Sequence, residues 1–232
     1  MIKVENVDVY GWSAAVRGMR NPMNSWDKSD SNFSCENCTG CYWIDVLNSD
    51  GDDTWCNHSN CRVGENDLKL MQTLSKAGSD HAKFLRYIDV TVDITAPLYF
   101  WKEFDTYRVG VVPNPIDIEM NSCSTMHKIH EKEFTIDDFS HEHIENTNML
   151  WMIPDELNTW RTLYLKTKDK RYWWQMIQLL PNSYNQKRTI KLNYQVLKNM
   201  YHSRKNHKLD EWREFCKWCE TLPYFKEICI DV

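Results

Sequence analysis

The sequence predicts an α+β fold in which a small mixed or antiparallel sheet packs against long helices. Two segments, residues 2–10 and 88–94, alternate apolar and polar side chains, which is typical of half-buried strands. From about residue 155 onward, apolar residues recur instead at helical spacing. Only 7 of the 232 residues are glycine, and a chain with so few tight turns favours helix.

The first hundred residues are expected to alternate between strands and helices. The expected elements are a strand over 2–10, a short helix over 13–21, an irregular stretch over 21–66, a helix over 66–78, a strand over 87–94 and a helix from Pro97. Asn66 or Asp67 can cap the start of the helix over 66–78, and Gly78 can end it. Proline is well placed in the first turn of a helix, because that turn needs no backbone N–H from it.

The helix from Pro97 has an unusual composition. Its segment, "APLYFWKEFDTYRVG" over 96–110, combines five aromatic residues with several charged ones. A core helix would carry fewer charges, and a surface helix fewer rings. We expect one set of rings to pack into the core, with Tyr107 and Arg108 at a ligand pocket.

The second half of the chain is expected to be mainly helical. Residues 111–150 read as a long loop with a broken helix, and four helices follow. These are expected at about 155–167, 169–180, 187–203 and 209–222, punctuated by Pro154, Pro181 and Pro223. With no repeat and no low-complexity linker, residues 1–232 are expected to form a single domain.

Composition limits the class of protein. Hydrophobic residues make up 42% and charged residues 26%, which is typical of a soluble globular protein. No apolar stretch approaches the roughly 20 residues of a spanning helix, and the N-terminus does not resemble a signal peptide. We therefore expect a cytoplasmic protein without a membrane segment. The net charge of −5 argues against a general nucleic-acid binder.

A local basic field interrupts this acidic chain. Residues 182–213 hold eight basic residues against two acidic ones, which suits a small anionic ligand. At helical spacing, Lys187, Lys191, Asn193 and Arg204 can point into one cleft. The alternative is a solvated basic face. Interleaved tyrosines and asparagines favour the ligand site, because rings and amides suit a nucleobase or an isoalloxazine ring.

Nine cysteines raise the question of a metal site. Five of them cluster in an excursion over about 31–65, which reads as an insertion: Cys35, Cys38, Cys41, Cys56 and Cys61. Reduced cytosolic thiols in a cluster suit structural zinc, which needs about four thiolate or imidazole ligands. The alternative is a set of free or facultatively bridged thiols, since the paired C-x2-C spacing of common zinc sites is absent.

Other candidate motifs have simpler readings. Four histidines, His127, His130, His141 and His143, are expected in a solvated loop, because no H-E-x-x-H pattern is present. Cys216 and Cys219 are expected to pack in a helix core. Neither a P-loop nor a G-x-G-x-x-G motif occurs, so any phosphate must be held by side chains. No catalytic triad stands out, which leaves the catalytic residues unknown and points to a cofactor for any chemistry.

Two segments resemble the flavin-dependent thymidylate synthase family. The first is "LKLMQTLSKAG…DVTVDITAPLYFWKEFDTYRVG". In that family a helix ending at glycine precedes a strand, and an A-P dipeptide opens a helix that ends in an R-H-R triplet. Here the triplet falls on Thr106, Tyr107 and Arg108, so only its last arginine matches.

The second segment is "LPNSYNQKRTIKLNYQVLKNMYHSRKNHKLDEW". By resemblance, Lys187, or Arg188 beside it, falls on a basic position that contacts the substrate nucleotide. Asn193 falls on a flavin-contacting asparagine, and Arg204 on the arginine that holds the nucleotide. In the S-x-R-Y signature, Ser124 stands for the serine but Met126 replaces the arginine.

The resemblance implies a thymidylate synthase-complementing-like fold, a homotetramer with active sites between subunits, and a divergent enzyme. Such an enzyme would methylate dUMP, or a related pyrimidine deoxynucleotide, using methylenetetrahydrofolate, reduced FAD and NADPH. Arg108, Tyr107 and Asn193 would contact the cofactor. The nucleotide would contact Arg204, Lys187, Arg188 and Ser124.

Two other functions remain open. A catalytically inactive relative could bind a nucleotide or a protein on the same fold, as the changed triplet suggests. An interaction protein could instead use the cysteine-rich insertion as its working surface.

Overall fold

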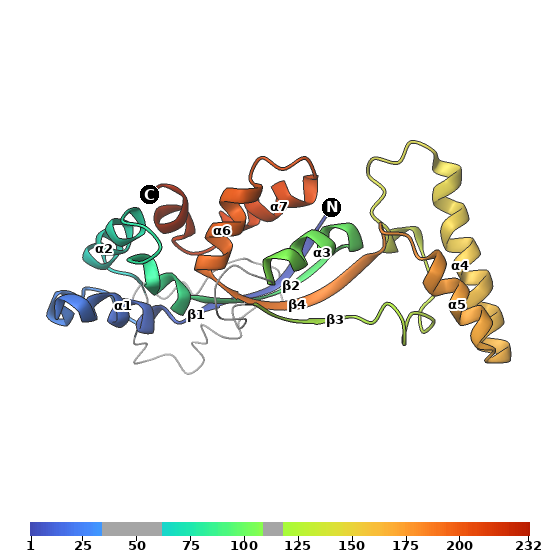
Figure 1. The fold of residues 1–232 in the computed structure, drawn as a ribbon, viewed down its shortest axis with the longest axis horizontal. Helices are drawn as coiled ribbons and strands as arrows, with labels where there is room; N and C mark the ends of the chain where they lie inside the picture. Colours follow the sequence, from blue (N-terminus) through green and yellow to red (C-terminus); the bar gives the residue numbers. More distant parts are fainter. Residues whose placement is uncertain (34–61, 109–117) are drawn as a thin grey trace. The chain divides into compact units, whose positions relative to one another are not determined.

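A computed structural model describes residues 1–33, 62–108 and 118–232 of the chain (Figure 1). Its strands form one four-stranded antiparallel sheet in the order β1-β2-β4-β3. They are β1 Lys3–Tyr10, β2 Asp89–Pro97, β3 Ile118–Ser122 and β4 Asn185–Asn193. The expected α+β class with a small sheet is confirmed.

The chain divides into two compact units. Unit 1 comprises Met1–Lys3, Ile94–Pro113 and Met120–Thr189. Unit 2 comprises Val4–Asp93, Asn114–Glu119 and Ile190–Val232. The boundaries fall inside strands of the sheet, so each unit contains strand residues. The expectation of a single domain stays a prediction.

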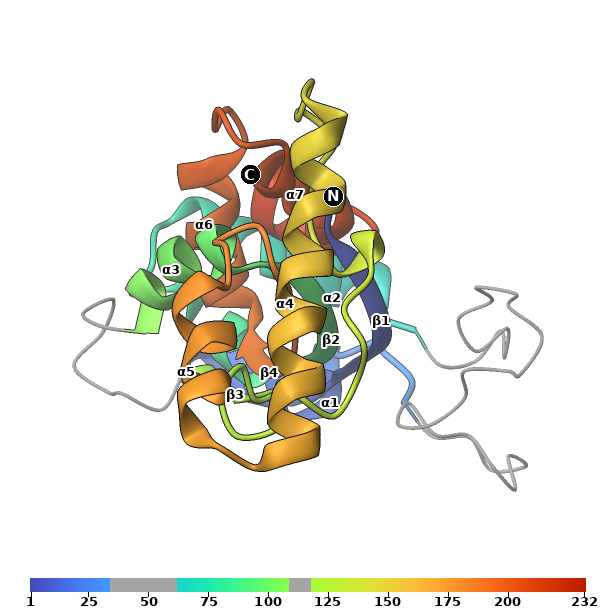
Figure 2. The same cartoon turned by 90° about the vertical axis from the view of Figure 1, so that its right-hand side faces the viewer.

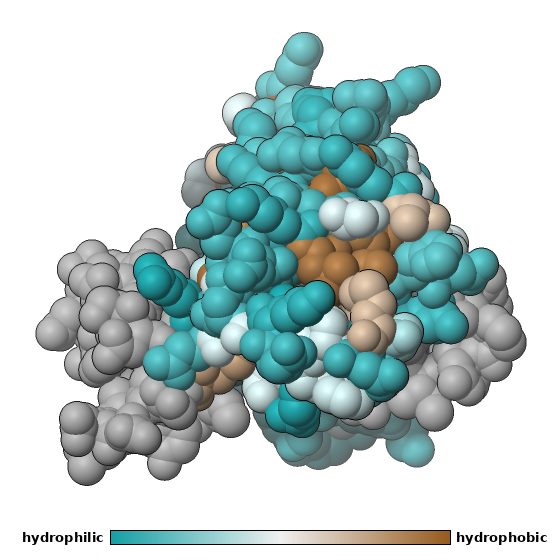
Figure 3. Space-filling model, turned by 90° about the vertical axis from the view of Figure 1, so that its left-hand side faces the viewer, coloured by the Kyte–Doolittle hydropathy of each residue, from teal (hydrophilic) through white to brown (hydrophobic). Residues whose placement is uncertain are grey.

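Unit 2 is built from helices around a core of aromatic rings. Its α-helices are α1 Trp12–Arg20, α2 Glu65–Lys76, α6 Tyr194–Arg204 and α7 Asp210–Cys219. It also contains 3-10 helices at Asn21–Met23, Trp26–Lys28 and Ala82–Tyr87 and a π-helix at Lys226–Ile230. The ring of Trp12 meets those of Tyr194 and Tyr224 edge-on, each at 5.5 Å between centroids. Figure 3 shows the end that carries α1 and α2 as largely hydrophilic around one small hydrophobic area.

One glycine sets the entry to α1. Gly11 has a φ of +94°, and a Cβ there would lie 1.8 Å from the backbone oxygen of Tyr87. Only glycine fits such a close approach in a left-handed conformation. The packing of α1 against the 3-10 helix Ala82–Tyr87 therefore depends on this residue.

A buried ion pair fastens α1 to α2 inside unit 2. The Nε of Arg20 lies 2.6 Å from Oδ1 of Asp67, and both side chains are almost fully buried. Asp67 Oδ2 also accepts hydrogen bonds from the hydroxyls of Ser29 and Ser31. Burial would raise the pKa of Asp67, but the hydrogen bonds from Ser31, Ser29 and Arg20 outweigh it and lower that pKa.

Unit 1 holds the remaining helices. They are α3 Leu98–Phe104, α4 Thr147–Thr167 and α5 Lys170–Leu179, with 3-10 turns at Asp105–Arg108 and Ile136–Asp138. Helices α4 and α5 form a hairpin and lie side by side (Figure 2). Lys168 makes its turn with a φ of +56°, and the side chain of Asp169 caps α5.

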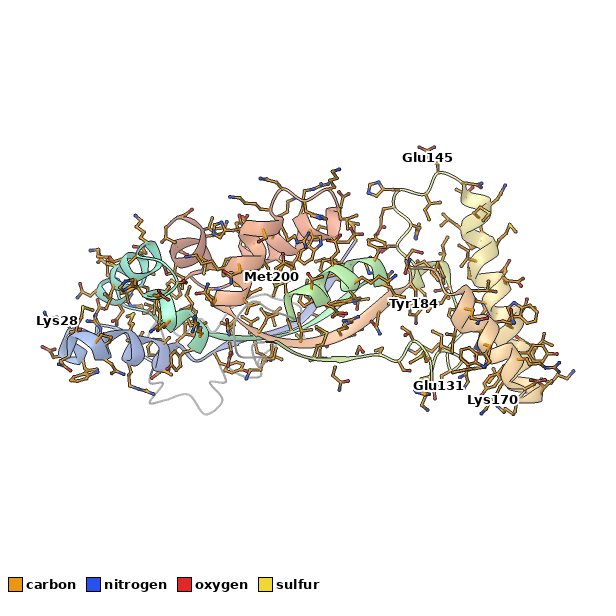
Figure 4. All side chains as sticks on the ribbon, viewed as in Figure 1. Lys28, Glu131, Glu145, Lys170, Tyr184 and Met200 are labelled. Atoms are coloured by element: carbon orange, nitrogen blue, oxygen red, sulfur yellow. The ribbon has the colours of Figure 1, made fainter. Side chains whose placement is uncertain are left out.

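One hydrophobic cluster of unit 1 joins this hairpin to the segment before it. Its buried members are Ile129, Phe134, Phe139, Leu157 and Met176. Tyr184, labelled in Figure 4, packs its ring against Phe134 and Phe139 at 6.4 and 5.8 Å between centroids. Burial raises the pKa of Tyr184 to about 12.

Several expected elements are confirmed. The strands over 2–10 and 87–94 match β1 and β2, and the helices over 13–21 and 66–78 match α1 and α2. Ile88, Val90, Val92 and Ile94 are all fully buried, as their alternation predicts. Gly78 follows α2 with a φ of +102°, so its part in ending the helix is also confirmed.

Three expectations about helices and loops are wrong. The predicted helix over 187–203 is instead strand β4 followed by α6, with Asn193 capping α6. The long loop with a broken helix expected over 111–150 contains the unexpected strand β3, whereas its helical part agrees with the start of α4. Pro154 lies within α4 and does not precede it, because the helix begins at Thr147.

The expected caps of α2 and α3 also differ. The carboxylate of Asp30 accepts hydrogen bonds from the backbone amides of Asn66 and Asp67, so the first turn of α2 is capped from outside the helix. Pro97 is the N-cap residue of α3, one residue before the helix begins. No helix in the described parts of the chain is long and apolar enough to cross a membrane.

Candidate functional site

Helix α3 explains the unusual segment that follows Pro97. Phe100, Trp101 and Phe104 are fully buried, with neighbouring ring centroids 5.2 to 5.8 Å apart. The indole Nε1 of Trp101 donates a hydrogen bond of 2.9 Å to the backbone oxygen of Gln186 on β4. The rings thus fix α3 against β4. The charged side chains of this segment lie on the outer face of α3 and in the turn that follows it.

Arg188 of β4 meets this aromatic helix. Its Nη1 donates to Oδ1 of Asp105 at 2.8 Å, and its Nε donates to Oε1 of Gln186 at 2.9 Å. The guanidinium carbon lies 4.4 Å from the ring centroid of Trp101, which is cation–π geometry. The Arg188 side chain is only 12% exposed, so the charge is held by these partners with little water around it.

The same cluster reaches the segment that carries Ser124. The amide Nε2 of Gln186 donates 2.7 Å to the backbone oxygen of Cys123, and the Cys123 amide donates 3.0 Å to the oxygen of Lys187. Ser124 is exposed, and its Oγ accepts a hydrogen bond of 2.9 Å from the amide of His127. Ser124 is therefore positioned by β4, with its hydroxyl at the surface.

The other expected ligand residues of unit 1 lie close to this cluster in sequence. Tyr107 and Arg108 belong to the 3-10 turn that Asp105 begins, and Tyr107 is half-buried. The Arg108 side chain lies outside the described parts. Lys187 is half-buried and points to the face of β4 opposite Arg188, because successive strand residues alternate.

Two expected ligand residues belong to unit 2. Asn193 is buried, and its Oδ1 accepts a hydrogen bond of 3.1 Å from the amide of Val196 as the cap of α6. Arg204, at the end of α6, stacks its guanidinium over Trp212 of α7 at 4.9 Å from the ring centroid. The helical assignment of Lys187 and Asn193 is wrong, since both belong to strand β4, and the common cleft stays a prediction. Their roles in binding stay predictions.

The candidate metal ligands cannot be placed. Cys35, Cys38, Cys41, Cys56 and Cys61 all lie outside the described residues. Within residues 1–33, 62–108 and 118–232, no three His, Cys, Asp or Glu side chains come together as a metal site would require. The four histidines His127, His130, His141 and His143 are among the residues that form no such cluster. His130 is half-buried, with its ring centroid 4.9 Å from that of Tyr164.

The expectation for the C-x-x-C pair of α7 is confirmed. Cys216 and Cys219 are buried in the core of unit 2. Burial raises the pKa of Cys216 to about 11 and that of Cys219 well above its ordinary value. Both side chains are therefore thiols at neutral pH and serve as apolar packing.

Sequence reasoning missed the partners that hold Arg188. Asp105 and Trp101 belong to the segment over 96–110 that combines aromatic and charged residues, and their spacing of four places them on one side of α3 and its following turn. Gln186 lies two residues before Arg188, on the same face of β4. The strand period would have paired Gln186 with Arg188, had β4 been recognised as a strand.

Comparison with known proteins supports the fold. No protein-family model matches the chain, and no curated protein matches it. Among solved structures, thymidylate synthase X (ThyX) from Helicobacter pylori with FAD and dUMP matches at a TM-score of 0.66 and 14% identity. That match covers 100% of this chain and 98% of the other.

A second structure agrees with the first. Flavin-dependent thymidylate synthase ThyX from Helicobacter pylori, complexed with FAD and dUMP, matches at a TM-score of 0.65 and 15% identity over 98% of this chain and 99% of that one. At such identities the likeness shows the fold alone. The chain therefore has a ThyX-like α+β fold over nearly its whole length.

Proposed function

We propose that this chain is a divergent flavin-dependent thymidylate synthase. It would bind FAD and a pyrimidine deoxynucleotide, and methylate dUMP with methylenetetrahydrofolate as carbon donor and NADPH as reductant. The observation that carries the proposal is the full-length likeness to ThyX structures that hold both FAD and dUMP. As in the family that the sequence resembles, we propose a cytoplasmic homotetramer with active sites between subunits.

The residues that we propose for the flavin have suitable chemistry. Tyr107 offers a half-buried ring and a hydroxyl, which suit stacking and hydrogen bonding to an isoalloxazine ring. Asn193 uses its Oδ1 to cap α6, so its amide nitrogen is the atom that can donate to a flavin carbonyl. When bound, reduced FAD would supply the hydride, and these residues would orient its ring system.

The residues that we propose for the nucleotide are cationic or hydroxylic. Lys187 and Arg204 are each half-buried, and each carries a charge that suits a phosphate. The stacking of Arg204 on Trp212 restricts the directions in which its guanidinium can donate. The exposed hydroxyl of Ser124 can bond to the base or sugar. Arg188 could bind a phosphate only by giving up its pairing with Asp105.

Product formation tests this function directly. The purified protein is incubated with dUMP, methylenetetrahydrofolate, FAD and NADPH, and the nucleotides are separated by chromatography. We expect dTMP to form only when all four compounds are present. Absence of dTMP at every protein concentration, with the chain folded by circular dichroism, would refute the enzyme proposal.

A second candidate function is nucleotide binding without catalysis. It is favoured by Thr106 and Tyr107 in place of an arginine and a histidine, and by Met126 in place of another arginine. Equilibrium dialysis with labelled dUMP separates the two proposals. Binding of dUMP without dTMP formation would support the inactive relative. If the protein neither binds dUMP nor forms dTMP, both proposals are excluded.

A further inference from the structure

We propose that Arg188 is a positioning residue that braces two ligand-binding segments at once. Through Asp105 it holds the turn that contains Tyr107 and Arg108, and through Gln186 it holds the segment that contains Ser124. The link to ligand binding rests on the proposed function. The brace itself rests on contacts within unit 1.

The first arm of the brace is the ion pair with Asp105. Asp105 directly follows α3 and begins the 3-10 turn Asp105–Arg108. Its carboxylate is 41% exposed, whereas Arg188 is 12% exposed and lies over the buried ring of Trp101. The guanidinium is thus the fixed partner, and it sets where the more exposed turn can lie.

The second arm runs through Gln186. Its Oε1 accepts from Arg188 Nε at 2.9 Å, and its Nε2 donates to the Cys123 oxygen at 2.7 Å. The Arg188 bond fixes which way round the amide lies, so that its nitrogen faces Cys123. Because Ser124 follows Cys123 directly, the orientation of Gln186 affects the position of the Ser124 hydroxyl.

Arginine is required by this geometry. The planar guanidinium donates from Nε to Gln186 and from Nη1 to Asp105, while its face stacks on Trp101. A lysine carries its charge on a single nitrogen, so it could pair with Asp105 but would lose the hydrogen bond to Gln186. Misplacing a ligand-binding group by about 1 Å can reduce function about a hundredfold.

Hydrogen exchange measured by mass spectrometry tests the brace without any ligand. In Arg188→Met, we expect faster exchange in the peptides over both 105–108 and 123–127. Asp105→Ala should affect only the first peptide, and Gln186→Met only the second. Arg188→Lys should keep protection at 105–108 and lose it at 123–127.

Arg171 provides a matched control in the same unit. Its Nη2 lies 2.7 Å from Asp169 Oδ2, but its side chain is 83% exposed. Arg171→Met therefore removes an arginine–aspartate ion pair of similar length whose arginine is exposed to solvent. Unchanged exchange in both peptides of Arg188→Met, or the same small change in Arg171→Met, would overturn the inference.

Titration with FAD and dUMP tests the link to binding. We expect the dissociation constants to rise about tenfold to a hundredfold in Arg188→Met, and to stay unchanged in Arg171→Met. If the wild type binds and Arg188→Met binds equally well, Arg188 has a merely structural role and the inference is overturned. If the wild type binds neither ligand, the proposed function fails, and the exchange data alone decide whether the brace exists.

Discussion

Replacing Asp67 by asparagine should cost unit 2 a large share of its stability. The carboxylate is fully buried and pairs with Arg20, whose side chain is 5% exposed. Removing one partner of a buried pair leaves the other charge without compensation, which costs about 3–5 kcal/mol. For a domain of this size each kcal/mol lowers the melting temperature by about 2–4 °C, so the expected drop is roughly 6–20 °C.

The hydrogen bonds around Asp67 add to this cost. Oδ2 accepts from the Ser29 hydroxyl at 2.7 Å and from the Ser31 hydroxyl and amide at 2.6 and 3.1 Å. An asparagine that keeps its oxygen toward Arg20 turns its NH2 group toward the Ser31 amide, so two donors face each other. The expected loss therefore lies at the upper end of the range.

Urea denaturation followed by circular dichroism measures this loss, and α2 itself offers the control. Glu65 and Lys69 form an ion pair with the same 2.6 Å distance, but their side chains are 79% and 66% exposed. Glu65→Gln should therefore change the free energy of unfolding by less than about 1 kcal/mol. The reasoning would be refuted if the two substitutions had equal effects.

The stabilisation by Asp67 should depend on pH in a defined direction. The folded-state pKa of Asp67 lies below its ordinary value, so the stabilisation is fully present above about pH 4, near the unfolded pKa, and is lost as the pH falls through the folded value. The difference in unfolding free energy between wild type and Asp67→Asn should shrink as the pH falls below about 4 and passes through the lowered folded-state pKa. A difference independent of pH would contradict this cause.

Three further predictions concern the two cores and the thiols. Met176→Ala, at a fully buried position of unit 1, should cost about 2–5 kcal/mol in urea denaturation, and a loss below about 1 kcal/mol would contradict its place in the core. Tyr194→Phe leaves the Pro223 oxygen without its 2.7 Å hydrogen bond and should cost about 1–3 kcal/mol, whereas a neutral effect would argue against that bond. Iodoacetamide should alkylate the exposed Cys123 in the native protein but not the buried Cys219, whose pKa is raised by burial; equal labelling of the two peptides by mass spectrometry would be inconsistent with the fold.

Local sequence patterns correctly predicted β2, α1 and α2. The alternation around β2 gave a strand with its buried face assigned correctly, because Val90 and Val92 are β-branched and separated by polar residues. Helices α1 and α2 and the buried C-x-x-C pair were recognisable for similar reasons. Strand β3 was missed because it is a short edge strand, and its pairing with β4 depends on residues far away in the chain.

Strand β4 was misassigned because of an ambiguity in spacing. Lys187 and Lys191 are four residues apart, and that spacing places two side chains on one face of a helix and also on one face of a strand. The buried positions Gln186, Ile190 and Leu192 follow the period of two, but the basic residues between them obscured it. The cap at Asn193 marks the true start of the helix.

The arrangement of the candidate site could not be read from the sequence. Arg188 and Asp105 are 83 residues apart, and Gln186 and Cys123 are 63 residues apart, so no local period connects them. The resemblance to the family suggested individual positions such as Ser124 and Lys187, whose roles stay predictions. It could not show that Arg188 stacks on Trp101, because that contact needs β4 to be a strand beside α3.

The visible absorption spectrum of the purified protein, recorded alone, with FAD and then with dUMP, tests the central claim most directly. We predict a protein-bound flavin band near its usual position in the blue that shifts when dUMP is added, because both ligands would share one site. A folded protein that leaves the spectrum of free FAD unchanged, with and without dUMP, would contradict the account and leave the ThyX-like fold without a flavin function.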